Sequence, residues 1–154
     1  MLTTEVSNIY SQEGKVRRIH NLIFAPSFEV VESIRSKLGN LGKLSSDGRP
    51  IFSFSAKDLV KMILDISTEC LIIPAHAWTP WFSVFGANSG FDSIEECYGE
   101  MASHIHAIET GLSSDPEMNW KIKELEDKAI LSFSDSHSFW PWRLGREATI
   151  FSLK

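Results

Sequence analysis

The sequence predicts an α/β protein in which mostly parallel strands alternate with surrounding helices. Short apolar runs without helical periodicity, such as residues 69–74 and 129–133, are typical of strands buried on both faces. Stretches with apolar residues three and four positions apart lie between such runs, and strands that alternate with helices usually pair in parallel. In folds of this kind the functional groups gather at the carboxyl ends of the strands.

The first half of the chain is expected to hold three strands and two helices. Ser27 and Ser55 are expected to cap the helices, because each serine directly precedes apolar residues with helical spacing. Residues 45–50 combine serine, aspartate, glycine and proline, which favour turns, and are expected to form a loop. The expected elements are strands over residues 1–10, 16–25 and 69–74 and helices over residues 28–38 and 56–66.

The second half continues the alternation after a long loop that runs to Phe91. Asp92 or Ser93 is expected to cap the next helix. No repeat, low-complexity segment or linker interrupts the chain, so residues 1–154 are expected to form a single domain. The expected elements are helices over residues 94–101 and 120–128 and strands over residues 105–110, 129–133 and 149–153.

Composition limits the classes of protein that fit. The chain has 154 residues, 43% of them apolar, and a net charge of −5. This predicts one packed core and no basic surface that wraps nucleic acid, although a metal and a few arginines can still bind a phosphate locally. Cys70 and Cys97 lie in apolar surroundings, as reduced thiols do. No apolar run reaches the ~20 residues of a membrane span, and the N-terminus has no signal pattern, so a soluble cytoplasmic protein without membrane contact is expected.

Asp135 and His137 follow the apolar run at residues 129–133. Residues two apart on a strand point to the same side, so a carboxylate and an imidazole would converge. Oxygen and nitrogen donors of this kind suit Zn²⁺ or Mn²⁺. The alternative is a helix-capping aspartate beside a surface histidine.

Two further candidates, His76 and Glu109, also lie at predicted strand ends. Each has a structural alternative: His76 as a hydrogen-bonded core histidine, and Glu109 as an ordinary ion-pair partner. His20 lies within a predicted strand, where a structural role is the usual one. His104 and His106 lie at the wrong end of their strand to join the site.

The chain contains five long motifs: Pro-Ala-His-Ala-Trp-Thr-Pro-Trp-Phe from Pro74, Ser-Gly-Phe-Asp-Ser-Ile-Glu-Glu from Ser89, Glu-Thr-Gly-Leu-Ser-Ser-Asp-Pro from Glu109, Ser-Asp-Ser-His from Ser134 and Leu-Gly-Arg-Glu-Ala from Leu144. These motifs resemble the PHP (polymerase and histidinol phosphatase) superfamily, and most of all its endonuclease Q branch. The resemblance implies a distorted (β/α) barrel with a cluster of two or three zinc or manganese ions that hydrolyses phosphoester bonds. In the endonuclease Q branch the substrate is DNA with deaminated bases, nicked on the 5′ side of the lesion.

The resemblance implies a role for each candidate residue. Asp135 and His137 resemble the last metal-binding D-x-H, His76 the mid-chain metal histidine, and Glu5 and His20 a bridging glutamate and the histidine after it. We predict His76, Asp135 and His137 as catalytic residues.

A second set of residues is predicted to contact the substrate. Arg143 or Arg146 would hold a phosphate as a bidentate cation, unless they pair with Glu147. Trp78 belongs to loops whose tryptophans would stack a displaced base. Glu109 is placed with this phosphate-binding group.

One departure separates this sequence from the family: no H-x-H motif precedes Glu5. This predicts an incomplete PHP-type barrel with fewer metal ligands and open edges, which a homo-oligomer would cover. Three functions stay open. The first is a metal-dependent phosphoesterase or DNA endonuclease, the second a non-catalytic PHP-like module that binds metal or phosphate weakly, and the third an unrelated α/β protein with packing histidines.

Overall fold

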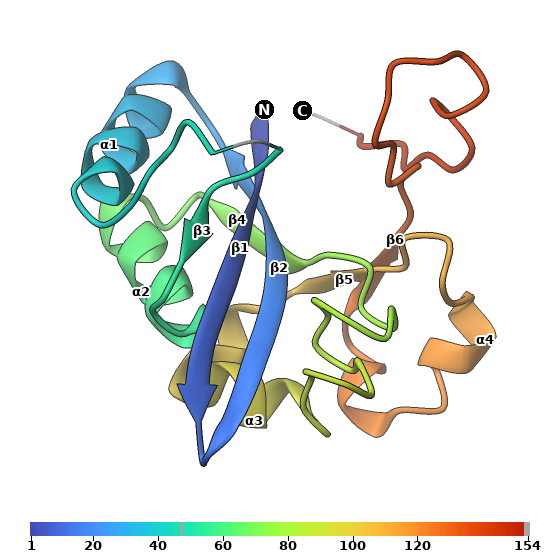
Figure 1. The fold of residues 1–154 in the computed structure, drawn as a ribbon. Helices are drawn as coiled ribbons and strands as arrows, with labels where there is room; N and C mark the ends of the chain where they lie inside the picture. Colours follow the sequence, from blue (N-terminus) through green and yellow to red (C-terminus); the bar gives the residue numbers. More distant parts are fainter. Residues whose placement is uncertain (47, 153–154) are drawn as a thin grey trace.

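The computed structural model describes residues 1–46 and 48–152 (Figure 1). The strands are β1 (Leu2–Gln12), β2 (Lys15–Ala25), β3 (Ile51–Phe52), β4 (Leu71–Pro74), β5 (Ala107–Glu109) and β6 (Ala129–Leu131). The helices are α1 (Phe28–Gly39), α2 (Ala56–Ile66), α3 (Ile94–Tyr98) and α4 (Pro116–Asn119), with 3₁₀ turns at Gly99–His104 and Lys123–Leu125.

A long hairpin of β1 and β2 forms the centre of the molecule, in blue in Figure 1. The two strands pair antiparallel from Leu2 opposite Ala25 to Gln12 opposite Lys15. Glu13 and Gly14 connect them with φ angles of 52° and 74°. Two consecutive residues with positive φ make the kind of two-residue turn whose twist matches that of the flanking strands.

The predicted incomplete PHP-type distorted (β/α) barrel with mostly parallel strands is wrong. The main sheet has the order β3-β1-β2-β4 and is mixed, because β1 and β3 are parallel whereas β2 is antiparallel to both β1 and β4. β5 and β6 form a separate parallel pair, and no barrel closes within residues 1–46 and 48–152. The physical reason is the two-residue turn, since only antiparallel strands can be joined by so short a connection. The protein is a small α/β fold.

The two long helices occur where the sequence predicts them. Ser27 Oγ accepts a hydrogen bond from the N–H of Val30, and Ser55 Oγ accepts one from the N–H of Asp58. Both helices lie on the same side of the main sheet in Figure 1. Their apolar faces pack into one core with the sheet; its members include Val6, Ile19, Ile23, Ile34, Leu38, Leu59, Ile63 and Ile72.

The later elements differ from the prediction. α3 ends at Tyr98 and continues as a 3₁₀ turn, and the helix expected over residues 120–128 is replaced by α4 and a second 3₁₀ turn. Asp115 starts α4 early, because its Oδ1 accepts the N–H of Met118 and Pro116 fits the first helical turn. Residues 149–152 form no strand, and position 153 of the predicted last strand lies outside the described residues, as does position 47 of the predicted loop.

A chain of buried polar side chains ties the hairpin to α3. The hydroxyl of Tyr98 donates to Asn21 Oδ1 at 2.6 Å, and Asn21 donates to Asn8 Oδ1 at 3.2 Å. Asn8 in turn donates to the carbonyl of Phe54 at 3.1 Å. Such a chain stabilises a fold only when every member has its partner.

Replacing Tyr98 with phenylalanine is therefore expected to lower the free energy of unfolding by about 1–3 kcal/mol, because Asn21 Oδ1 loses its donor inside the core. Urea denaturation measures the change. Tyr10→Phe is the matched control, since the buried hydroxyl of Tyr10 has no hydrogen-bond partner in the described part of the chain. An equal decrease in the free energy of unfolding for Tyr98→Phe and Tyr10→Phe would contradict the role given to the Tyr98 hydroxyl.

Cys70 and Cys97 are both buried free thiols, and burial raises the pKa of each.

Among the described helices, none combines the length and the apolar composition that a membrane crossing needs.

Candidate metal site

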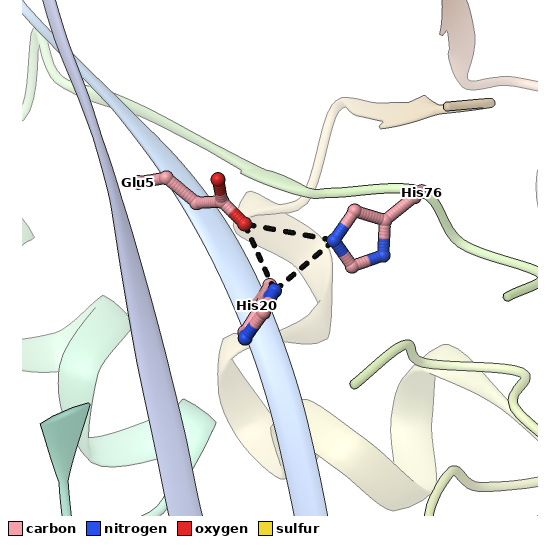
Figure 2. A group of neighbouring side chains, drawn as sticks. All are labelled: Glu5, His20 and His76. Carbon is pink, nitrogen blue, oxygen red and sulfur yellow. Dashed lines mark hydrogen bonds and ion pairs between the residues drawn. The ribbon is translucent and has the colours of Figure 1, made fainter. Parts of the chain in front are cut away.

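Three side chains point their donor atoms at one another: Glu5 from β1, His20 from β2 and His76 from the loop after β4 (Figure 2). His20 Nδ1 lies 2.9 Å from Glu5 Oε1 and 3.0 Å from His76 Nε2. His76 Nε2 lies 3.5 Å from Glu5 Oε1. One carboxylate oxygen and two imidazole nitrogens thus form a compact triangle.

The register of the hairpin brings Glu5 and His20 together. His20 pairs with Ser7, two residues from Glu5, so the side chains of Glu5 and His20 are diagonal neighbours on one face of the sheet. The β2–β4 ladder continues past its last strand pair, because the N–H of Ala75 donates to the carbonyl of His20 at 3.0 Å. His76 follows directly and is brought next to His20.

Glu109 holds the backbone at His76 in place. Its carboxylate accepts hydrogen bonds from the N–H groups of His76 at 2.7 Å, Gly111 at 2.7 Å and Phe133 at 3.0 Å. Burial raises the pKa of Glu109, although these N–H groups oppose the shift. His76 has a φ of 34°, in the left-handed region that non-glycine residues rarely adopt, and such a backbone persists only when its surroundings hold it. The predicted contact of Glu109 with phosphate stays a prediction, and both of its oxygens are engaged with the backbone here.

Thr79 fixes the tautomer of His76. The Thr79 hydroxyl lies 2.8 Å from the carbonyl of Trp81 and 3.1 Å from that of His76, so its single proton points to a carbonyl. Its oxygen also lies 3.0 Å from His76 Nδ1 and must accept the proton of that nitrogen. We therefore place a proton on Nδ1, which leaves Nε2, the nitrogen that faces Glu5 and His20, as the one that can bind a metal.

The three donor atoms fit a divalent cation. Tetrahedral zinc with bonds of about 2.0–2.1 Å places its ligand atoms about 3.3 Å apart, close to the edges of the observed triangle. Glu5 Oε1 is buried and accepts no hydrogen bond of good geometry from the described residues. A buried acceptor of this kind needs a partner, and a cation would supply it.

The protonation states of Glu5 and His20 also suit the binding of a metal. Burial raises the pKa of Glu5, but the nearby nitrogens of His20 and His76 and the charge of Arg49 outweigh it and hold the pKa well below its usual range. Burial lowers the pKa of His20, and the charges of His76 and Arg49 lower it further, against the opposing effect of Glu5. A charged carboxylate and a neutral imidazole are the forms that bind metals.

Arg49 is a site residue that the sequence analysis missed. Its Nη2 lies 3.3 Å from Glu5 Oε2, and its Nη1 lies 3.1 Å from His20 Nδ1. Arg49 lies in a loop without periodicity or motif, so no sequence signal pointed to it. Its guanidinium balances the charge of Glu5 at the mouth of the site.

A cavity of about 410 Å³ opens beside the triangle. Glu5, His76, Glu109 and Asp135 all line it. Asp135 thus shares the cavity but is not among the three residues whose donor atoms meet. His137 is exposed, and its Nδ1 lies 3.0 Å from the carbonyl of Asp135. Among the described residues, the structure gathers Glu5, His20 and His76 and leaves the Asp135 and His137 pair outside this group.

The other three residues predicted to bind substrate, Trp78, Arg143 and Arg146, are not among those that line the cavity. Arg143 is exposed, and the side chain of Arg146 donates to the carbonyl of Ser134. Neither arginine forms an ion pair with Glu147 in the described chain, because Glu147 accepts hydrogen bonds from hydroxyl groups instead. Trp78 is partly buried and donates to Asn119 Oδ1 at 2.8 Å, which is a packing role.

The protein is thus a small α/β fold with a candidate site for a divalent metal. Its structure matches that of the lesion-specific endonuclease PfuEndoQ from Pyrococcus furiosus with a TM-score of 0.77 and 33% sequence identity. The match covers 95% of this chain and 33% of that one. The predicted resemblance to the endonuclease Q branch therefore has a structural counterpart.

Two curated proteins are also similar in sequence. The uncharacterized protein YqxK of Bacillus subtilis is 31% identical over 130 residues, which are 84% of this chain and 32% of YqxK. The uncharacterized protein MJ0043 of Methanocaldococcus jannaschii is 44% identical over 72 residues, which are 47% of this chain and 8% of MJ0043. This chain therefore spans at most about a third of the proteins it matches. No family model matches it, so membership of the PHP superfamily stays a proposal.

Proposed function

We propose that this chain is the metal-binding domain of a metal-dependent phosphoester hydrolase of the PHP type, which acts on DNA with damaged or deaminated bases. The observation that carries the proposal is the triangle of Glu5, His20 and His76 beside a cavity. The likeness to a lesion-specific endonuclease over 95% of the chain supports the choice of substrate.

The donor set favours zinc over manganese as the metal. Two imidazoles and one carboxylate are a common set of protein ligands in catalytic zinc sites, which leave a further position open for water or substrate. When bound there, such an ion polarises a phosphoryl oxygen and lowers the pKa of a bound water towards neutrality.

The remaining residues have roles that do not require the metal to be in place. Glu109 and Thr79 orient His76 through its backbone N–H and its Nδ1. Arg49 presents a cation at the cavity that binds a phosphate oxygen of the substrate. Asp135 lines the same cavity and accepts a proton or a hydrogen bond from the substrate.

Nicking of a lesion-containing duplex tests the proposal. Metal-stripped protein is incubated with Zn²⁺ or Mn²⁺ and either a duplex that contains one deoxyuridine or deoxyinosine or the same duplex without a lesion. We expect cleavage that requires both the metal and the lesion, and we expect His106→Ala, an exposed histidine outside the site, to cleave like the wild type. Cleavage that persists in a strong chelator would contradict the proposal.

The second candidate is a non-catalytic metal-binding module. It is favoured by the small number of ligands, since the described residues bring together only three donors whereas a cluster of two or three metals needs more. Near-stoichiometric zinc without cleavage of either duplex would support this candidate. The sequence analysis also predicted a homo-oligomer that covers open sheet edges, and this stays a prediction.

A further inference from the structure

The loop of residues 137–146, here called the aromatic loop, carries three stacked and exposed rings. The rings of Phe139 and Trp140 lie 5.3 Å apart at 25°, and those of Trp140 and Trp142 lie 5.1 Å apart at 9°. The three residues are 80%, 50% and 67% exposed. Aromatic area on this scale outside the core is a mark of an interaction surface.

The stack is held as a unit at the surface. The N–H of Arg146 donates to Ser134 Oγ at 3.0 Å, and its side chain donates to the carbonyl of Ser134, which together close the base of the loop. The N–H of Arg143 donates to the carbonyl of Trp140 at 2.8 Å within it. In Figure 1 this segment, in red, rises from β6 away from α1 and α2. Phe139 and Trp142, the two ends of the stack, are also its most exposed members.

The charge of the aromatic loop is opposite to that of the chain. The whole chain has a net charge of −5, but residues 136–146 contain no aspartate or glutamate and two arginines. Arg143 is exposed and forms no ion pair with any described residue. Stacked rings beside a free cation suit nucleobases and phosphates better than they suit an apolar protein surface.

The aromatic loop also begins at the candidate site. Asp135 and Ser136, which directly precede it, line the cavity of about 410 Å³ together with Glu5 and His76. A strand that lies along the loop would therefore lead into this cavity.

We infer that the aromatic loop binds single-stranded DNA. A nucleobase stacks on the open face of Trp142 or Phe139 and extends the existing stack, and Arg143 contacts a neighbouring phosphate. This inference rests on the proposed function for its choice of DNA, but binding at the loop does not need the metal.

Fluorescence anisotropy with a labelled oligothymidylate tests the inference. The measurement is made in a chelator, with wild-type protein, Trp142→Ala, Phe139→Ala and Trp120→Ala. Trp120 is the matched control because it is 61% exposed but lies at the end of α4, outside the loop. We expect Trp142→Ala or Phe139→Ala to raise the Kd about 5- to 100-fold, as removal of one stacking partner does, and Trp120→Ala to leave it unchanged.

A salt titration separates the role of Arg143. Arg143→Ala is expected to reduce the slope of log Kd against log salt by about 0.7, the value for one phosphate contact with a single strand. Because every binding measurement is made in a chelator, the affinity for the oligonucleotide does not depend on the metal, so failure of the metal site and failure of the loop are distinguishable. The inference is overturned if the wild type does not bind the oligonucleotide, or if Trp142→Ala and Phe139→Ala bind it equally well. It is also overturned if these variants only convert a self-associated protein into a monomer, which would make the loop a protein contact.

Discussion

Replacing His76 with alanine is expected to weaken zinc binding by more than the ~10–100-fold that loss of an outer-shell partner costs. The variant removes one corner of the triangle and leaves Glu5 and His20 as the remaining two donors. His20→Ala and Glu5→Gln are expected to have effects of similar size, because each removes one donor atom. Competition with a chromophoric chelator measures the affinity of each variant.

The controls for this prediction separate coordination from general damage. His106→Ala removes an exposed imidazole and should bind zinc like the wild type. Thr79→Val keeps all three donors but removes the acceptor for His76 Nδ1, so it should weaken zinc binding by less than His76→Ala does. Unchanged zinc content in His76→Ala, His20→Ala and Glu5→Gln would leave the histidines as packing residues and remove the basis of the proposed function.

The donor triangle shows where sequence reasoning succeeds and where it stops. Glu5, His20 and His76 could be named from their motifs, but their meeting depends on the antiparallel register that sets Ser7 opposite His20. Strand periodicity shows which residues share a face of one strand but not which strand is the neighbour. The same limit applies to the wrong barrel, since the parallel strands were inferred from the alternation of strands and helices and the barrel from the family resemblance.

The pair of Asp135 and His137 illustrates a second limit. The expectation that they share a side assumed extended backbone, but β6 ends at Leu131 and Asp135 has a φ of 43°. In the left-handed region the alternation of a strand no longer applies. A metal role for this pair stays a prediction, and the shared cavity is the feature that keeps Asp135 near the site.

Contacts between side chains and backbone groups could not be predicted from the sequence. Glu109 was recognised as an acid at a strand end, but no pattern shows that its oxygens accept three N–H groups from separate segments. Arg49 was missed for the same reason, since its place beside Glu5 comes from the path of a loop.

Replacing Gly111 with alanine is expected to lower the free energy of unfolding by about 2–5 kcal/mol. Gly111 has a φ of 53°, and a Cβ added there would lie 2.2 Å from the Cβ of His76 and 2.8 Å from its Cα. The strain of a positive φ and the overlap with His76 therefore add. Urea denaturation measures the loss.

The same substitution is expected to weaken zinc binding, because the chain can relieve the overlap only by moving His76 away from Glu5 and His20. Gly14→Ala is the matched control. Gly14 also has a positive φ, 74°, but a Cβ there meets nothing within 4 Å, so only the backbone strain should appear and zinc binding should be unchanged. If Gly111→Ala destabilises the protein no more than Gly14→Ala and binds zinc normally, the backbone at His76 is not held against Gly111 as the structure has it. The hydrogen bond from the His76 N–H to Glu109 would then remain as a support of this backbone. By itself that bond could not account for the left-handed conformation that directs the His76 side chain towards Glu5 and His20.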